Sequence, residues 1–340
     1  MYNPAQIVAS PNEYAIPHWP SHVTCSKVQF DKELNSRFLG ACGWDGSLRL
    51  FHVGTVGFSE PRAEFYPGKP LLCCSFAKST RLACGGLDNA VSIFDLEKRV
   101  GQKLGSHNSA VRCLEYNEKG DLLVSGGWDA SIKLWDCRGA REPLQTAMVS
   151  EKVYAMDVHE DTVVVGTRDR KIYVFDQRNI ASPVSIKESP LKYQMRAIKI
   201  EPAGQFFVVS SIEGRIAVEY LNQADKGKNY AFKAHRMQVD GVEQIYPVNA
   251  LDFHPYHGSF VSGGSDAMIN VWDPLNRKRL VQFHKYNTSI SSASFNFDGS
   301  QLAITQAYLG ELEVDPIPKP ANQIVIRSVS EMESRPKCTN

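Results

Sequence analysis

The chain lacks a dominant charge, long apolar runs and the short motifs of common catalytic sites. Its 340 residues carry 38 Lys and Arg against 37 Asp and Glu, so no overall field favours nucleic acid or a membrane surface. No apolar run is long enough to cross a bilayer, and residues 1–20 have neither the basic start nor the apolar core of a signal peptide. Nucleotide-binding glycine motifs, serine-nucleophile motifs and zinc-protease motifs are missing, so we predict no enzyme, no cofactor and no small-molecule substrate.

The metal-binding and disulfide signals are also weak. His254 and His257 have a suitable spacing for a metal, but no Cys or carboxylate stands close by, so a pair of turn histidines is favoured. The eight cysteines form no Cys-x-x-Cys pair, and several sit among apolar residues, as buried thiols do in a reducing compartment. The basic run 276–279 resembles a nuclear import signal, but it directly follows a strand end and is better explained as a solvated turn.

What the chain does have is a repeat of about 40 residues. In each copy an aliphatic residue is followed two positions later by a small one, and three positions beyond that by an aromatic or aliphatic one. The seven copies begin at Val23, Leu71, Val111, Val153, Met195, Val248 and Ile290. Each period has room for several short strands, which is typical of propeller blades, so we predict an all-β propeller with seven blades.

A second signal follows the first in most repeats. An apolar strand leads into a Gly/Asp turn, and then into an alternating strand that ends in an aromatic residue and Asp. These ends are Phe94-Asp95, Trp135-Asp136, Phe175-Asp176 and Trp272-Asp273. Glycine permits a positive φ in a tight hairpin and Asp bonds its own turn, so turn and dipeptide together resemble the WD-repeat signature. His107 and His235 precede first strands, where we expect them to hydrogen-bond the turn Asp.

The fifth and seventh repeats depart from this signature. The fifth has Glu213-Gly214-Arg215 at its turn and Glu219-Tyr220 in place of the dipeptide, which reflects either drift or a binding surface around Arg215. The seventh has no Trp-Asp pair, and 324–326 is its candidate last strand.

Ring closure and domain boundaries follow from the two ends of the repeat array. We expect the strand 13–16 to pair beside 324–326, because closure removes two exposed sheet edges. Prolines then occupy the loop before the last strand, at Pro316, Pro318 and Pro320. The predicted parts are an N-terminal extension at 1–11, one propeller domain at 12–327 and a polar tail at 328–340.

The second position of each repeat is expected beside the central channel of the propeller. These positions are Thr24, Leu72, Arg112, Tyr154, Arg196, Asn249 and Ser291. Three consecutive blades therefore offer Arg, Tyr and Arg, a composition common at binding hot spots and suited to an acidic peptide. Composition alone leaves open that these are merely solvated charges on a large face.

Several longer segments resemble a known family. They are Leu-Lys-Tyr-Gln-Met-Arg (191–196), Ser-Ser-Ile-Glu-Gly-Arg (210–215), Tyr-Ala-Phe-Lys-Ala-His-Arg (230–236) and Glu-Gln-Ile-Tyr-Pro-Val-Asn-Ala (243–250). Together they are similar to the WD-repeat mitotic spindle-checkpoint family, the third "budding uninhibited by benzimidazole" proteins, over about residues 12 to 330. A sister family, the nuclear-pore mRNA export WD-repeat factors, shares the second of these segments and the Lys-Tyr-Gln of the first.

The resemblance implies a non-enzymatic adaptor in the nucleus, acting at kinetochores during mitosis. Such adaptors bind GLEBS motifs, which are short acidic segments of checkpoint kinases and pseudokinases, and phosphorylated Met-Glu-Leu-Thr repeats of a kinetochore scaffold. By the family motif, Arg196 pairs with GLEBS glutamates, with Tyr154 and Arg112 expected beside it. Arg215 and Arg236 match the pair that binds phosphothreonine, and Trp44 matches an aromatic residue that lines the groove.

The chemistry of these residue types fits those ligands. A phosphate group of charge near −2 needs several donors, and planar guanidinium groups supply bidentate contacts that lysine cannot. The alternative is the export branch, with a nucleoporin GLEBS motif and RNA as partners, although the near-neutral charge makes direct nucleic-acid binding the weaker expectation.

Overall fold

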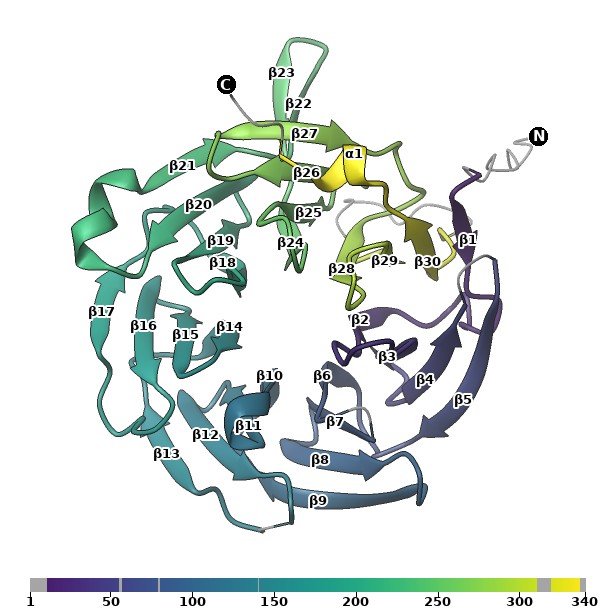
Figure 1. Cartoon of the computed structure of the whole chain (residues 1–340), viewed down its shortest axis with the longest axis vertical. Coiled ribbons are helices and arrows are strands. Elements are labelled where there is room, and N and C mark those ends of the chain that lie inside the picture. Colours follow the sequence, from purple (N-terminus) through teal and green to yellow (C-terminus); the bar gives the residue numbers. More distant parts are fainter. Residues whose placement is uncertain (1–10, 55–56, 79, 140, 311–318, 337–340) are drawn as a thin grey trace.

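Seven four-stranded antiparallel sheets are arranged in a ring in the computed structural model, which describes residues 11–54, 57–78, 80–139, 141–310 and 319–336 (Figure 1). The prediction of a seven-bladed all-β propeller is therefore confirmed. Each blade runs from an inner strand beside the central axis to an outer strand on the rim.

The strands of each blade follow one another in the chain, except in the last blade. From the inner strand outward, blades 1 to 4 are β2 (Cys25–Phe30), β3 (Phe38–Gly43), β4 (Leu48–Val53) and β5 (Ser59–Phe65); β6 (Leu71–Phe76), β7 (Arg81–Gly86), β8 (Ala90–Asp95) and β9 (Val100–Ser106); β10 (Val111–Asn117), β11 (Leu122–Gly127), β12 (Ser131–Asp136) and β13 (Gln145–Met148); β14 (Val153–His159), β15 (Thr162–Thr167), β16 (Lys171–Asp176) and β17 (Ser185–Glu188). Blades 5 to 7 are β18 (Met195–Ile200), β19 (Phe206–Ser211), β20 (Arg215–Tyr220) and β21 (Tyr230–Lys233); β24 (Val248–Phe253), β25 (Phe260–Gly264), β26 (Ile269–Asp273) and β27 (Lys278–Gln282); β28 (Ile290–Phe295), β29 (Gln301–Gln306), β30 (Gln323–Ser328) and β1 (Glu13–Ala15).

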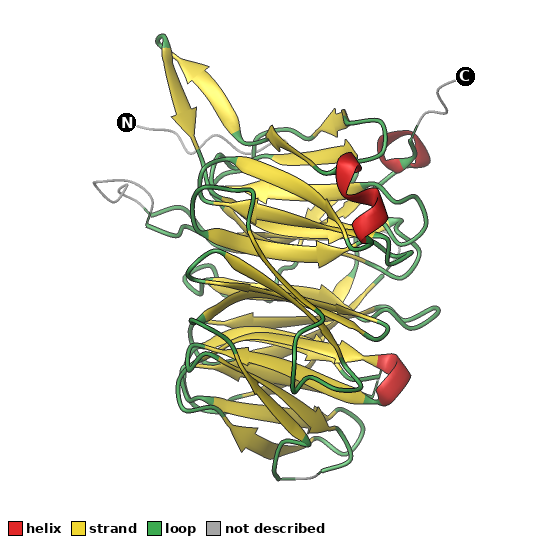
Figure 2. Ribbon diagram, turned by 90° about the vertical axis from the view of Figure 1, so that its left-hand side faces the viewer, coloured by secondary structure: helices red, strands yellow, loops and turns green. Residues whose placement is uncertain are grey.

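The two faces of the ring carry different connections. The face that we call upper carries the turns between the second and third strands and the connections between blades. The lower face carries the remaining turns, and with them η1 (Glu118–Gly120), η2 (Gln223–Lys228) and α1 (Glu331–Ser334). Figure 2 shows these helices on one side and the hairpin of β22 (Arg236–Val239) and β23 (Val242–Ile245) projecting on the other. Among the described residues, no helix has the length and apolar character needed to span a membrane.

The ring closes between its first and last blades, as predicted. β1 pairs with β30 in the register Glu13 to Arg327 and Ala15 to Val325. The carboxylate of Glu13 accepts hydrogen bonds from Arg327 and from the hydroxyl of Tyr286. Beneath the pair lies an apolar cluster built from both ends of the chain, with members such as Trp19, Phe30, Leu39, Ala303, Ile324 and Ile326. Burial of these side chains makes closure favourable, because an open ring would expose them to water.

Blades 3 and 6 contain a complete internal hydrogen-bond network. In blade 3, His107 Nδ1 lies 3.0 Å from Asp129 Oδ1 and its Nε2 lies 2.7 Å from Ser125 Oγ, which also accepts from Trp135 Nε1 at 2.7 Å. In blade 6, His235 Nδ1 lies 2.8 Å from an oxygen of the turn residue Asp266. The predicted bond from each histidine to its turn Asp is confirmed. These bonds satisfy polar groups that would be costly to bury alone.

The first repeat was misaligned in the prediction. Cys25 pairs with Gly43 as Val111 pairs with Gly127, so the inner strand of blade 1 starts two residues after Val23. The second position of this blade is consequently Ser26 and not Thr24. The sequence pattern allowed both alignments because a shift of two residues keeps every side chain on the same face of a strand.

The ends of the chain add less regular structure. Most of the predicted extension, residues 1–10, lies outside the described residues, as do Pro316, Pro318 and the last part of the tail, 337–340. The described part of the tail contains α1, whose Ser334 is buried and accepts a hydrogen bond from Ser259 at its carbonyl. Seven cysteines are buried free thiols, as their apolar neighbours in the sequence predicted.

The histidine pair on the lower face is part of a turn, as predicted. His254 Nδ1 accepts hydrogen bonds from the backbone of Tyr256 and of His257, and the two imidazole rings stack 4.0 Å apart.

Candidate functional site

Irregular pairing of the inner strands turns a side chain toward the channel in six of the seven blades. In each blade the register between the first two strands shifts at the second repeat position, for example between Val111 and Cys113 in blade 3 and between Val153 and Ala155 in blade 4. Such a bulge bends the strand and re-aims the residue that it leaves unpaired. The side chains exposed in this way are the ones that line the upper part of the channel.

The structure brings together the three residues predicted for an acidic peptide. Arg112, Tyr154 and Arg196 come from β10, β14 and β18, the inner strands of three consecutive blades. All three are partly exposed and line a cavity of about 120 Å³ at the channel, together with Ser26, Asn249 and Ser291. Leu72 is buried and does not line the cavity, so that part of the predicted ring was wrong.

Arg196 is held in place by the next blade. Its Nε and Nη2 donate to Asn249 Oδ1 at 3.1 and 2.9 Å, and Asn249 Nδ2 donates to Ser265 Oγ at 2.9 Å. A neutral amide positions the guanidinium group without neutralising it. Arg196 therefore presents a positive charge in a fixed orientation, which suits an incoming carboxylate.

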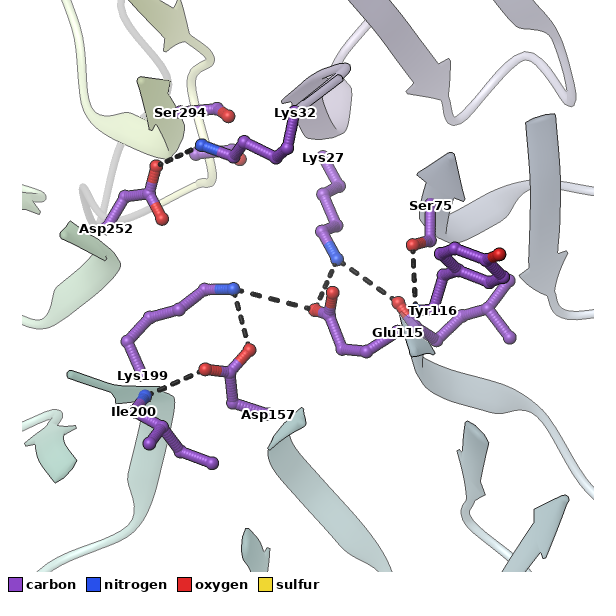
Figure 3. A network of polar contacts seen from close by, with 12 residues as sticks. Lys27, Lys32, Ser75, Glu115, Tyr116, Asp157, Lys199, Ile200, Asp252 and Ser294 are labelled. Atoms are coloured by element: carbon purple, nitrogen blue, oxygen red, sulfur yellow. Dashed lines mark hydrogen bonds and ion pairs between the residues drawn. The ribbon is translucent and has the colours of Figure 1, made fainter. Parts of the chain in front are cut away.

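Deeper in the channel, the side chains at position five within the repeats join neighbouring blades. In four blades this side chain accepts a hydrogen bond from the backbone amide of the next blade's inner strand. The four pairs are Ser75 with Tyr116 (3.1 Å), Asp157 with Ile200 (2.7 Å), Asp252 with Phe295 (2.7 Å) and Ser294 with Phe30 (3.0 Å). Figure 3 shows the first two of these contacts. They link adjacent blades beside the apolar clusters, to which the donor residues Phe30, Ile200 and Phe295 belong.

Ion pairs cross the channel at the same level. Lys27 Nζ lies 2.7 Å from Glu115 Oε1, and Lys199 Nζ lies 2.8 Å from Asp157 Oδ1 and 3.9 Å from Glu115 Oε1 (Figure 3). Lys32 reaches Asp252 at 3.4 Å. Three lysines thus balance three carboxylates.

Burial and charge pairing pull the pKa values of this network in opposite directions. Burial alone would lower the pKa of Lys199, but the carboxylates of Asp157 and Glu115 outweigh burial and raise it. Burial would raise the pKa of Glu115, but Lys199 and Lys27 outweigh it and lower that pKa. Burial raises the pKa of Asp157, and the charge of Lys199 offsets only part of that rise. These ion pairs are a structural feature of the channel wall.

The two arginines predicted to bind phosphate lie on neighbouring segments of the upper face. Arg215 begins β20 and lies opposite Lys233 of β21 in the sheet. Arg236 begins β22, and its Nη2 donates to the carbonyl of Glu213 at 2.7 Å, one residue before Gly214. Gly214 has φ of +62°, and a Cβ there would lie 2.7 Å from the His235 carbonyl, so glycine permits this close approach.

The structure also shows that Arg236 already has an acidic partner. Its Nη1 lies 3.0 Å from Glu243 Oε2 on the facing strand of the hairpin, and only 12% of its side chain is exposed. Lys233 Nζ contacts the other carboxylate oxygen of Glu243 at 2.8 Å. By contrast, Arg215 is partly exposed and forms no ion pair with the residues that the structure describes. The predicted pair is therefore unequal: one arginine is available and the other is engaged.

Trp44 is not part of the same pocket. It lies in the turn between β3 and β4, and half of its surface is exposed. Blades 6 and 7 separate this turn from Arg215, so a ligand would have to run across the upper face to touch both.

Other residues of this surface were missed by the sequence reasoning. Lys233 and Glu243 complete the group around Arg236, and both stand in segments that the family resemblance already singled out. Tyr193, 56% exposed, lies on the upper face directly before β18 and adds an aromatic side chain near Arg196. Its exposure is a tertiary property that the pattern Lys-Tyr-Gln does not reveal.

Comparison with known proteins points to one family. The model of the family described as "WD domain, G-beta repeat" matches residues 98–136 and 232–273, which include the histidine networks of blades 3 and 6. The chain is 51% identical to "Mitotic checkpoint protein bub-3" of Caenorhabditis elegans over 99% of both chains. It is 39% identical to "Mitotic checkpoint protein BUB3.1" of Arabidopsis thaliana, over 89% of both chains. It is also 33% identical to "mRNA export factor GLE2" of Chaetomium thermophilum, over 80% of this chain and 77% of that one.

Proposed function

The chain belongs to the Bub3 family of mitotic checkpoint WD-repeat proteins, and from this membership we propose that it is a non-enzymatic adaptor of the spindle assembly checkpoint. It acts in the nucleus and at kinetochores during mitosis, and it joins two ligands on its upper face. The observation that carries the proposal is the gathering of basic and aromatic side chains on that face, in a chain similar along its whole length to checkpoint proteins.

The first ligand is the acidic GLEBS segment of a checkpoint kinase or pseudokinase. Arg112, Tyr154 and Arg196 receive it at the channel mouth, where the bulged inner strands aim their side chains. Arg196 supplies a guanidinium group that Asn249 holds in position, and the ring of Tyr154 supplies apolar contact area next to it.

The second ligand is a phosphorylated Met-Glu-Leu-Thr segment of a kinetochore scaffold. Arg215 provides the open contact, while Lys233 and Arg236 are held by Glu243 in the absence of ligand. A phosphate group near charge −2 competes well with one partly exposed carboxylate for these two cations. Phosphorylation then decides whether the segment binds, which makes recruitment depend on kinase activity.

Calorimetry with a phosphorylated peptide and its bare form tests this second site. We expect the parent protein to prefer the phosphorylated peptide at least about tenfold, since charge-assisted hydrogen bonds are the strongest available to such a surface. Replacing Arg215 and Arg236 by Ala should remove that preference and leave the melting temperature almost unchanged. Arg178→Ala, which removes an exposed arginine of the lower face, is the matched control. Equal affinity of the parent protein for both peptides would refute the assignment.

The acidic segment is tested separately. Arg196→Glu places a carboxylate where the ligand's glutamates are expected and should release a GLEBS peptide without changing phosphopeptide binding. Loss of both ligands together would mean that the substitution had damaged the face as a whole.

Similarity to an mRNA export factor supports a second candidate, an export adaptor that binds a nucleoporin GLEBS motif and RNA. This function predicts RNA binding whose affinity falls steeply with salt, because phosphate contacts release counterions. A pull-down from dividing cells separates the two: checkpoint kinases support the first proposal and pore components the second.

A further inference from the structure

The lower face has a cavity that the proposed peptide-binding surface does not use. It has a volume of about 150 Å³ and lies where the turns after β2, β6 and β10 meet, beside the lower end of the channel. A single water needs only about 10–15 Å³ on the same measure, so the cavity has room for a small organic group. Its walls include Phe30, Phe76 and the ring of Tyr116.

Two acceptor atoms of this cavity lack a donor. The carboxylate oxygen Oδ2 of Asp31 is buried, and the whole residue is only 2% exposed. The amide oxygen Oε1 of Gln29 is buried as well, and neither oxygen has a hydrogen-bond partner among the residues that the structure describes. The two residues stand two positions apart, so their side chains leave the chain on the same side. Gln29 also stands at position five within its repeat. In four other blades the side chain at this position accepts a hydrogen bond from the backbone of the next blade.

The negative charge of Asp31 is not needed for the turn in which it lies. Asp31 Oδ1 accepts from the backbone amide of Glu33, and backbone hydrogen bonds from Asp31 to Phe38 and from Ser36 to Glu33 also hold the turn. In blade 3 the same position is Asn117, whose Oδ1 accepts from Lys119 in the same way. An amide therefore satisfies the turn, and the second oxygen of Asp31 is left for another purpose. Burial raises the pKa of Asp31, and hydrogen bonds from the Ser36 hydroxyl and from the backbone of Glu33 and Lys32 offset only part of that rise.

The lysines of the cavity do not neutralise Asp31. Lys32 contacts Asp252 and the carbonyl of Phe295 across the channel. Lys78 contacts Asp121 at 3.5 Å, on the side of blade 3. A nearly buried carboxylate oxygen without a cation is unfavourable, because water can no longer solvate it fully.

We propose that this cavity binds a primary ammonium group on an apolar stem, with Asp31 Oδ2 as its charged acceptor and Gln29 Oε1 as its second acceptor. Methylene groups of the stem pack against Phe76 and Tyr116, as lysine stems commonly pack on apolar surface. A divalent metal fits less well, because calcium takes six to eight oxygen ligands and no group of three or more metal-binding side chains occurs within the described chain. The ammonium group belongs either to a lysine of a partner protein or to a free polyamine.

NMR titration of the full chain with Nα-acetyl-lysine methylamide tests the proposal, with the uncharged Nα-acetyl-norleucine methylamide as its isosteric control. We expect the lysine probe to bind at least about tenfold more tightly than the norleucine probe. The side-chain amide signal of Gln29 should shift with the lysine probe alone. Equal binding of both probes would overturn the proposal, because the cavity would then recognise only the stem.

Two variants test whether the carboxylate of Asp31 is the group that binds the ammonium ion. Asp31→Asn keeps the turn, as Asn117 shows, and should weaken the lysine probe at least about tenfold with no loss of melting temperature. Asp240→Asn removes the same charge from the hairpin of the upper face and should leave binding unchanged. Should Asp31→Asn fail to fold, Gln29→Leu removes only the second acceptor and should weaken binding about threefold. Unchanged lysine binding in folded Asp31→Asn, or in Gln29→Leu in its place, contradicts the proposal.

Cadaverine and a short lysine peptide distinguish the two sources of the ammonium group. Tighter binding of the peptide assigns the cavity to a protein partner, and tighter binding of the free diamine assigns it to a polyamine. This cavity lies on the face opposite to the proposed peptide ligands. If it does not bind an ammonium group, the proposed adaptor function is unaffected.

Discussion

Replacing Glu115 by Gln in the channel is expected to destabilise the ring more than replacing its partner Lys27. Glu115 contacts Lys27 at 2.7 Å and Lys199 at 3.9 Å, and its side chain is only 10% exposed. Glu115→Gln leaves two lysines facing each other with Asp157 as the remaining carboxylate. Breaking a buried pair from one side costs about 3–5 kcal/mol. Because the lysines keep about a fifth of their surface exposed, we take a lower value of about 2–3 kcal/mol.

Lys27→Met has a smaller effect for a structural reason. Glu115 keeps Lys199, and the unbranched Met side chain is about as long as that of Lys, so Met fits without crowding. The expected loss of unfolding free energy is about 1 kcal/mol, which includes the hydrogen bond from Lys27 to the carbonyl of Leu114. In the double variant the loss of unfolding free energy should be about 1 kcal/mol smaller than the sum of the two single losses, since both changes remove the same contact.

Urea unfolding at pH 7, followed by tryptophan fluorescence, measures these differences. With an unfolding entropy of about 2.1 cal/mol/K per residue over 340 residues, Glu115→Gln should also lower the melting temperature by about 3–4 °C. A larger loss for Lys27→Met than for Glu115→Gln would refute the reasoning, because Glu115 would then not be the shared partner of two lysines. Strictly additive losses would refute the direct contact.

Three other outcomes are expected. Glu243→Gln frees Lys233 and Arg236 and should raise the affinity for a phosphorylated peptide about threefold to tenfold in calorimetry, with Asp240→Asn unchanged; a fall in affinity would mean that Glu243 positions Arg236 for binding. Burial, helped by the stacked His257, lowers the pKa of His254 to about 4, so the folded state binds a proton less readily than the unfolded state. The free energy of unfolding should therefore fall as pH drops from about 6.5 to 4, by about 2–3 kcal/mol more than in His254→Asn, and parallel pH profiles from urea unfolding would contradict this. Removing residues 1–16 deletes β1 and exposes the edge of β30, so light scattering should detect association that is absent when only residues 1–10 are removed.

Much of the fold was accessible from the sequence because its determinants are local and repeated. A β-strand alternates its side chains with a period of two, and a blade needs its turn glycine and Asp close to its strands. The blade count, the closing pair of strands 13–16 and 324–326, and the bonds of His107 and His235 were predicted on this basis. The partly exposed ring of Arg112, Tyr154 and Arg196 followed from the same register.

The sequence by itself determined the number of blades, their order and five of the seven side chains predicted to line the channel, because these depend on neighbours within about 40 residues. Only the tertiary structure decided which of two alignments blade 1 adopts, that Glu243 engages Arg236, and that Lys27 meets a carboxylate 88 residues away. Only the tertiary structure, too, decided that the buried Oδ2 of Asp31 has no hydrogen-bond partner among the described residues. Contacts of this kind depend on the distance between blades once the ring has closed, and a strand pattern with a period of two does not determine that distance.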